Sequence, residues 1–128
     1  AQVRALAETC RPRLGGRPLG FHFHNTRNTG YANAAEAIEG GAAVLDASVG
    51  GLGGCPFAPG ATGNIATEDL RYLMERSGHP TGIDAAALDA VVGWLSERVP
   101  EEIAGQLHKA GGFPAAAAAV ETPAAAAR

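Results

Sequence analysis

Cysteine is scarce in this sequence: Cys10 and Cys55 are its only two, and they lie in unlike surroundings. A disulfide-stapled fold is therefore excluded, and a reducing, intracellular compartment is expected. Long apolar runs are also missing, because no stretch approaches the roughly 20 apolar residues that a membrane-spanning helix needs. We expect no membrane partner.

An excess of basic charge is lacking as well. Ten Lys and Arg oppose thirteen Asp and Glu, which gives a formal net charge of −3 over 128 residues. Nothing electrostatic favours a nucleic-acid partner. The first ten residues lack the basic start and apolar run of a signal peptide, although the chain begins without methionine.

Hydrophobic spacing and Gly or Pro boundaries divide the chain into short elements. They predict helices over about 1–10, 30–40, 67 onward and 84–100, and strands over 18–24 and 43–49. Alternating helices and strands with brief connections favour an α/β fold with a parallel sheet. Thr67 and Asp84 are the predicted helix caps. Residues 1–110 are expected to form the folded portion, followed by an Ala-rich disordered tail over 111–128.

Two histidines share one face of the first predicted strand, because side chains two positions apart in a strand point the same way. His22 and His24 lie on that face, and Phe21 and Phe23 lie on the other. Two imidazoles at the end of a strand can hold one metal ion. The alternative is that both histidines only bond their neighbours on a half-buried strand, and the pattern alone leaves both open.

A glycine-rich loop over 49–64 carries one thiol, Cys55, near its middle. Such a loop can close over a site and bring the thiol with it, although a connector with an incidental cysteine also fits. Asn64 ends the loop. Its side-chain oxygen can bind a metal, or the residue can serve as a turn or cap before the next helix.

Four segments together resemble successive signatures of the hydroxymethylglutaryl-CoA lyase family, in order and at matching separations. They are HFHNT (22–26), DAS (46–48), GLGGCP (51–56) and GATGNIATEDL (60–70). The resemblance covers about residues 1–99. Its most specific part is the Gly-Gly-Cys-Pro loop, because the related isopropylmalate and homocitrate synthases share the histidine pair and a Gly-Asn but not this cysteine.

The resemblance implies a partial TIM (β/α)8 barrel, with this chain supplying the last three or so strands and their helices. It also assigns roles to matching positions. The implied metal ligands are His22, His24 and Asn64. The implied catalytic groups are Cys55 and His22. The implied supporting residues are Asn25, Asp46 and Glu68.

The implied reaction is the retro-Claisen cleavage of 3-hydroxy-3-methylglutaryl-CoA to acetyl-CoA and acetoacetate, as in leucine degradation and ketone-body formation. A divalent metal, Mg²⁺ or Mn²⁺, would make the substrate hydroxyl more acidic. A base takes its proton, and an acid, assisted by a thiol, protonates the enolate that leaves. The partner is an acyl-CoA substrate, in the cytoplasm of a bacterium or the mitochondrial matrix of a eukaryote.

Three departures from the family pattern stand out. The family's first metal-binding aspartate and neighbouring arginine, on its first strand, and an acidic residue on its fifth have no counterpart here. Asn25 stands where the family usually has aspartate, and the pair at 27–28 is Arg-Asn where the family tends to have a smaller or aromatic residue and glycine. We therefore expect no turnover from these 128 residues alone.

Three readings follow. The chain is part of a longer lyase and works with the missing N-terminal barrel half; or it is a non-catalytic truncated relative; or it belongs to a related acyl-CoA condensing or cleaving enzyme. Open sheet edges would make the isolated chain prone to self-association, so a homo-oligomer is a further expectation.

Overall fold

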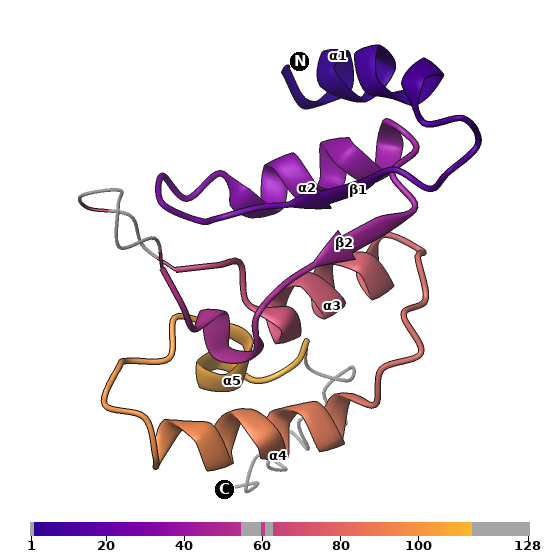
Figure 1. The fold of residues 1–128 in the computed structure, drawn as a ribbon. Helices are drawn as coiled ribbons and strands as arrows, with labels where there is room; N and C mark the ends of the chain where they lie inside the picture. The colour runs from indigo at the N-terminus through magenta and orange to yellow at the C-terminus, as the bar shows by residue number, and fades with distance from the viewer. Residues whose placement is uncertain (1, 55–59, 61–62, 114–128) are drawn as a thin grey trace, which may run out of the picture.

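The computed structural model describes residues 2–54, 60 and 63–113. Short helices alternate with two strands along the chain (Figure 1). None of the described helices is long and apolar enough to cross a membrane. In order, the elements are α1 Gln2–Cys10, η1 Arg11–Arg13, β1 Gly20–His22, α2 Gly30–Glu39, β2 Val44–Asp46, η2 Val49–Gly51, α3 Thr67–Arg76, α4 Ala85–Ser96 and α5 Leu107–Ala110.

Strands β1 and β2 pair in parallel, as the alternation of elements predicted. Gly20 lies opposite Val44, and His22 lies opposite Asp46. Parallel strands need a crossover connection, and α2 supplies it here. In Figure 1, α2 lies along β1 and α3 along β2, and both helices contribute residues to the same core. The register sets His22 directly beside Asp46.

The strands alternate between an exposed and a covered face. Both β1 and β2 read exposed, half-buried, exposed along their three residues. The covered face packs on a small core of Ala34, Ile65, Leu70 and Met74, with Phe23, Leu45 and Ala47 against it. The exposed face carries His22, Val44 and Asp46, and Val44 is 50% exposed.

The predicted helix caps have different outcomes. Asp84 caps α4, because its carboxylate accepts hydrogen bonds from the N–H groups of Ala86 and Ala87. The prediction for Thr67 is wrong by one position: Thr67 is the first residue of α3, and Ala66 occupies the cap without a side-chain bond. The structure supplies the Ala66 N–H with a partner from another helix, which local spacing cannot reveal.

Several predicted boundaries shift. The strands are shorter than expected, and α4 ends at Ser96 rather than near residue 100. In place of a third strand, the segment after the glycine-rich loop makes single bridges: Asn64 pairs antiparallel with His24, and Ala66 pairs parallel with Ser48. The segment turns into α3 at once, so no ladder can extend. Of the predicted tail, only residues 111–113 fall within the described part.

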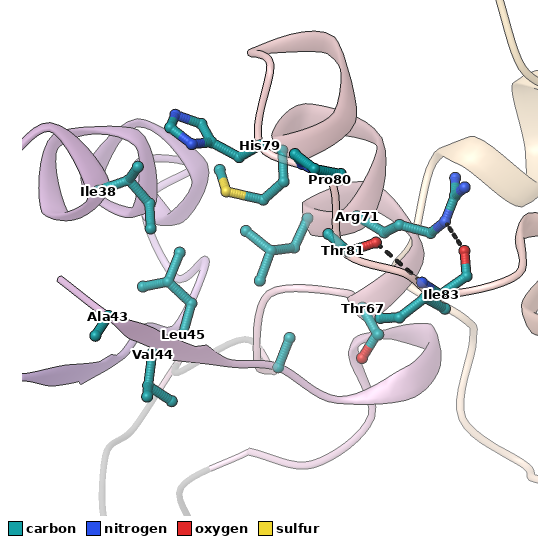
Figure 2. Close-up of a pocket in the computed structure, with 13 residues that line it drawn as sticks. Ile38, Ala43, Val44, Leu45, Thr67, Arg71, His79, Pro80, Thr81 and Ile83 are labelled. Atoms are coloured by element: carbon teal, nitrogen blue, oxygen red, sulfur yellow. Dashed lines mark hydrogen bonds between the residues drawn. The ribbon is translucent and has the colours of Figure 1, made fainter. Parts of the chain in front are cut away.

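An apolar cavity of about 440 Å³ lies between α2, β2, α3 and the turn at 79–83 (Figure 2). Ile38, Leu45 and Met74 are among its lining residues. Arg71 fixes the turn by donating from Nε to the Ile83 carbonyl at 2.7 Å. None of the residues predicted to do chemistry lines this cavity, so the candidate site is elsewhere.

Candidate metal and acyl-CoA site

The two histidines share a face as the strand pattern predicted. Their ring centroids lie 5.1 Å apart in an edge-on arrangement, while Phe21 and Phe23 stack at 5.6 Å on the other face. His22 Nδ1 lies 2.7 Å from Asp46 Oδ1. A carboxylate at Nδ1 favours the tautomer with the proton there, which leaves Nε2 free to accept a proton or a metal. Asp46 thus contacts His22 directly, and its supporting role in a metal site remains a prediction.

Asn64 joins this group through the backbone, since its bridge partner is His24. Its amide nitrogen Nδ2 donates to the Leu52 carbonyl at 2.8 Å and to the Gly53 carbonyl at 3.4 Å. Its oxygen Oδ1 is buried and has no hydrogen-bond partner among the described residues. A buried amide oxygen without a donor is costly, and a cation is one group that can satisfy it.

Glu68, four residues further on, is 3% exposed. One oxygen accepts the Gly50 N–H at 3.0 Å, which ties α3 to the start of the glycine-rich loop. The other oxygen, Oε1, is buried without a hydrogen-bond partner among the described residues. A Cβ on Gly105 would overlap it, so glycine is required there. Glu68 thus contacts the main chain of the glycine-rich loop, and the supporting role that the resemblance implies for it remains a prediction.

Asn25 has a local role that the sequence did not reveal. Its Oδ1 accepts the Gly30 N–H at 3.1 Å, and its Nδ2 donates to Asn28 at 3.2 Å. Asn28 has a positive φ of 55°, a conformation that asparagine tolerates better than most residues. Asn25 therefore organises the turn into α2. These two bonds are made by the asparagine that stands where the family usually has aspartate.

The loop thiol lies outside the described residues: the structure describes Gly54 and Gly60 but not Cys55 between them. Within the described part of the chain, no three His, Cys, Asp or Glu side chains are placed to hold a metal. The donors on hand are two imidazoles and one amide oxygen. These three groups could supply part of a ligand set, and their nitrogen and oxygen types suit a divalent cation of intermediate hardness.

Tyr31 is a residue that the sequence analysis missed. Its phenol oxygen accepts the Ala66 N–H at 2.9 Å and donates to Asp69 Oδ2 at 3.0 Å. Burial, reinforced by the charge of Asp69, raises the pKa of Tyr31 well above its ordinary value, against the opposing effect of the Ala66 bond. The phenol therefore stays protonated. A large side chain with a hydroxyl in an alanine-rich helix was the available signal, because half-buried tyrosines usually find a polar partner.

Asp69 links this region to the C-terminal segment. Besides the phenol, it accepts the N–H groups of Gln106 and Leu107, at 2.7 Å for the shortest bond. The same segment lines a cavity of about 350 Å³ beside Asn64, whose other walls include Asn25 and Tyr31. The C-terminal segment therefore lies beside Asn64, although neither His22 nor His24 lines this cavity.

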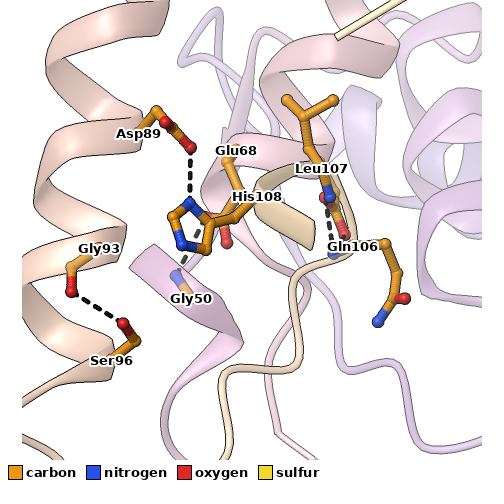
Figure 3. Close-up of polar contacts among 9 residues, drawn as sticks. Gly50, Glu68, Asp89, Gly93, Ser96, Gln106, Leu107 and His108 are labelled. Atoms are coloured by element: carbon orange, nitrogen blue, oxygen red, sulfur yellow. Dashed lines mark hydrogen bonds and ion pairs between the residues drawn. The ribbon is translucent and has the colours of Figure 1, made fainter. Parts of the chain in front are cut away.

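A second histidine–aspartate pair holds that segment in place (Figure 3). His108 Nδ1 lies 2.7 Å from Asp89 Oδ1 on α4. The His108 ring rests on Gly93, where a Cβ would come within 3.6 Å of it. This pair joins α5 to α4 and lies away from His22 and His24 in the sheet.

Comparison with known proteins agrees with this arrangement. An (R)-citramalyl-CoA lyase of Chloroflexus aurantiacus is 50% identical over 110 residues, which is 86% of this chain and 35% of the relative. A hydroxymethylglutaryl-CoA lyase of Bacillus subtilis is 40% identical over 99 residues, which is 77% of this chain and 33% of the relative. The chain thus spans about a third of the length of these curated relatives.

Solved structures match in fold as well. A hydroxymethylglutaryl-CoA lyase from Acinetobacter baumannii, in complex with coenzyme A and 3-methylmalate, superposes with a TM-score of 0.81 at 43% identity. The match covers 89% of this chain and 39% of that one. The described residues therefore form part of a TIM barrel, which confirms the predicted fold class. Because the HMGL-like family model also matches residues 1–95, the chain belongs to the HMGL-like family.

Proposed function

We propose that this chain carries the histidine and asparagine ligands of a divalent-metal-dependent lyase that cleaves a carbon–carbon bond in a 3-hydroxy-3-methyl acyl-CoA. One observation carries the proposal. His22 and His24 lie on one strand face, and the bridge partner of His24 is Asn64, whose buried Oδ1 has no hydrogen-bond partner among the described residues. The relatives named as CoA-ester lyases support the reaction class.

The residues present fit a divalent metal such as Mg²⁺ or Mn²⁺. His22 Nε2, an imidazole nitrogen of His24 and Asn64 Oδ1 would hold it, with remaining ligands from water, substrate or other chain segments. When bound, the metal would polarise the substrate hydroxyl and acyl oxygens and make that hydroxyl more acidic.

The chain's own residues supply orientation and proton handling. Asp46 fixes the His22 ring with its proton on Nδ1, so Nε2 is the only His22 nitrogen that can bind the metal or accept a proton, and it cannot do both at once. Loss of the hydroxyl proton lets the carbon–carbon bond break, its electrons pass to the acetyl-CoA carbon, and a proton must then reach that carbon. We propose the Cys55 thiol, from the glycine-rich loop, as the group that assists this last transfer.

The acyl group is the open point within this class. Hydroxymethylglutaryl-CoA would give acetyl-CoA and acetoacetate, whereas citramalyl-CoA, which has one methylene less, would give acetyl-CoA and pyruvate. One methylene changes transition-state binding only about 10- to 200-fold, so the two compounds must be compared directly. We propose hydroxymethylglutaryl-CoA as the substrate, because several relatives bear that name.

The test is product analysis on both thioesters, with Mn²⁺ and with chelator, for the 128-residue chain and for a longer protein that contains it. We expect metal-dependent acetoacetate from the longer protein and none from the 128 residues alone. Pyruvate would redirect the substrate proposal. If neither acetoacetate nor pyruvate forms with either protein, a non-catalytic relative is favoured. The His22→Ala variant of the longer protein is the control for the metal site.

We propose the cytoplasm as the compartment for a bacterial source and the mitochondrial matrix for a eukaryotic one. Relatives of both kinds occur, including a mitochondrial hydroxymethylglutaryl-CoA lyase of Gallus gallus at 50% identity over 70 residues.

A further inference from the structure

The segment that carries Asn64 is held by four successive backbone N–H groups. Asn64 N donates to the Gly53 carbonyl at 3.0 Å, Ile65 N to the Phe23 carbonyl at 3.2 Å, and Thr67 N to the Ser48 carbonyl at 2.9 Å. The Ala66 N–H is the exception, because its partner is a side chain, the phenol of Tyr31. Three anchors are therefore main chain, and the fourth depends on one residue type.

Ala66 cannot easily replace that partner. The residue is 1% exposed, so its N–H has little access to water. As the cap of α3, it precedes the helix, and its own methyl side chain makes no cap bond. Without the phenol oxygen this N–H would be left without an acceptor, and the backbone between Asn64 and Glu68 would have to shift to find one.

The direction of the phenol is fixed from its other side. Asp69 Oδ2 accepts a hydrogen bond from the Tyr31 hydroxyl, so the lone pairs of the phenol oxygen remain for the Ala66 N–H. Asp69 is itself held by the N–H groups of Gln106 and Leu107. The chain of bonds thus runs from the C-terminal segment through Asp69 and Tyr31 to a backbone amide two residues from Asn64.

We propose that Tyr31 is a positioning residue, which sets the place of Asn64 Oδ1 in the metal site by holding the Ala66 amide. The inference rests on the proposed function, because it concerns that same site. Tyr31 touches neither metal nor substrate in this scheme. Its effect passes through two residues of backbone and is separate from the Nδ2 bond by which Asn64 orients its own amide group.

The experiment is a double-mutant cycle on Mn²⁺ binding, followed by electron paramagnetic resonance of the free ion. Tyr31→Phe removes only the hydroxyl, and the ring remains packed against the core, so the fold should persist. Loss of a supporting hydrogen bond should raise the Mn²⁺ Kd about tenfold. Tyr72→Phe on α3 is the matched control and should leave the Kd unchanged.

Asn64→Ala completes the cycle. If Tyr31 acts through Asn64, Tyr31→Phe in the Asn64→Ala background should have no further effect on the Kd, whereas independent effects would multiply. Thermal unfolding of each variant separates loss of metal affinity from general destabilisation, because a purely structural role would lower Tm without changing the Kd of the folded protein.

The outcomes are distinct. A raised Kd for Tyr31→Phe that disappears in the Asn64→Ala background supports the inference. An unchanged Kd, or full multiplication of the two effects, overturns it while leaving the metal site intact, provided that His22→Ala and Asn64→Ala each weaken binding. If those two variants bind Mn²⁺ as well as the unaltered chain does, the proposed metal site is wrong and the inference falls with it.

Discussion

Two histidine–aspartate pairs in this molecule have the same geometry and different surroundings. In each, an imidazole Nδ1 lies 2.7 Å from a carboxylate oxygen. The His22–Asp46 pair spans two parallel strands at matched register, next to His24. The His108–Asp89 pair spans two helices, and its ring packs on Gly93.

The difference lies in what the second ring nitrogen can reach. His22 lies on the exposed face of the sheet beside the His24 imidazole, and His24 is bridged to Asn64, whose Oδ1 has no hydrogen-bond partner among the described residues. His108 is used as a clasp between α5 and α4 and has no such neighbours among the described residues. The groups around a histidine–aspartate pair therefore indicate whether it belongs to a functional site, and the distance within the pair does not.

The largest expected effect separates the two histidines by metal affinity. His22→Ala removes a proposed ligand and should raise the Mn²⁺ Kd at least about 100-fold, the upper end of what loss of a supporting residue gives. His108→Ala should leave the Mn²⁺ Kd unchanged and lower Tm, because it removes the contact that joins α5 to α4. Titration calorimetry with MnCl₂ and thermal unfolding measure the two quantities. Equal effects of both variants on the Kd would break the comparison.

The two aspartates should differ in the same direction by a smaller amount. Asp46→Asn keeps the shape but weakens the hold on the His22 tautomer, so the Mn²⁺ Kd should rise about tenfold. Asp89→Asn should reduce the protection of α5 amides against hydrogen exchange, with the Kd unchanged. A metal affinity that ignores Asp46→Asn would show that the His22 ring is oriented by something else.

The smallest effect concerns a carboxylate without a histidine. Hydrogen bonds from the Ala87 and Ala86 N–H groups hold the pKa of Asp84 below its ordinary value. Its contribution to stability is therefore complete above the unfolded-state pKa and is lost as pH falls through the lower, folded-state pKa. Asp84→Ala should lower Tm near neutral pH, and the difference from the unaltered chain should shrink in acid.

Asp84→Asn is the matched control for that titration. The amide oxygen of this variant still accepts the two N–H bonds, so the helix cap remains. Because the amide cannot ionise, the Tm difference between Asp84→Asn and the unaltered chain should vary with pH over the same acidic range. A pH-independent difference between Asp84→Ala and the unaltered chain would contradict the assigned role.

Local sequence patterns predicted the helices and the histidine face because these depend on neighbours in the chain. The two-residue period of a strand was enough to place His22 with His24, and an aspartate before an apolar helical run was enough to predict the α4 cap. The parallel pairing of β1 and β2 followed from their alternation with α2.

Contacts between segments that are distant in the sequence could not be predicted from local patterns. Tyr31 and Ala66 are 35 residues apart, and the partner of an amide cannot be deduced from spacing. The same holds for α5, a four-residue helix whose first N–H groups are bonded by Asp69 from another helix. The family resemblance supplied Asn64 and Glu68 as candidates, but their bonds to the glycine-rich loop required the fold. The predicted role of Cys55 remains a prediction.

The exposed face of β1 and β2 leaves the His22–Asp46 pair open to dissolved ions. The side chains of His22 and Asp46 are 52% and 67% exposed, so the Asp46 carboxylate is in contact with mobile ions. At physiological ionic strength such attraction is screened over about 8 Å, and an exposed ion pair adds little to stability. The orientation of His22 therefore rests on the directional hydrogen bond to Asp46 more than on charge. Rising ionic strength loosens any contribution from charge while leaving the register of the two strands unchanged.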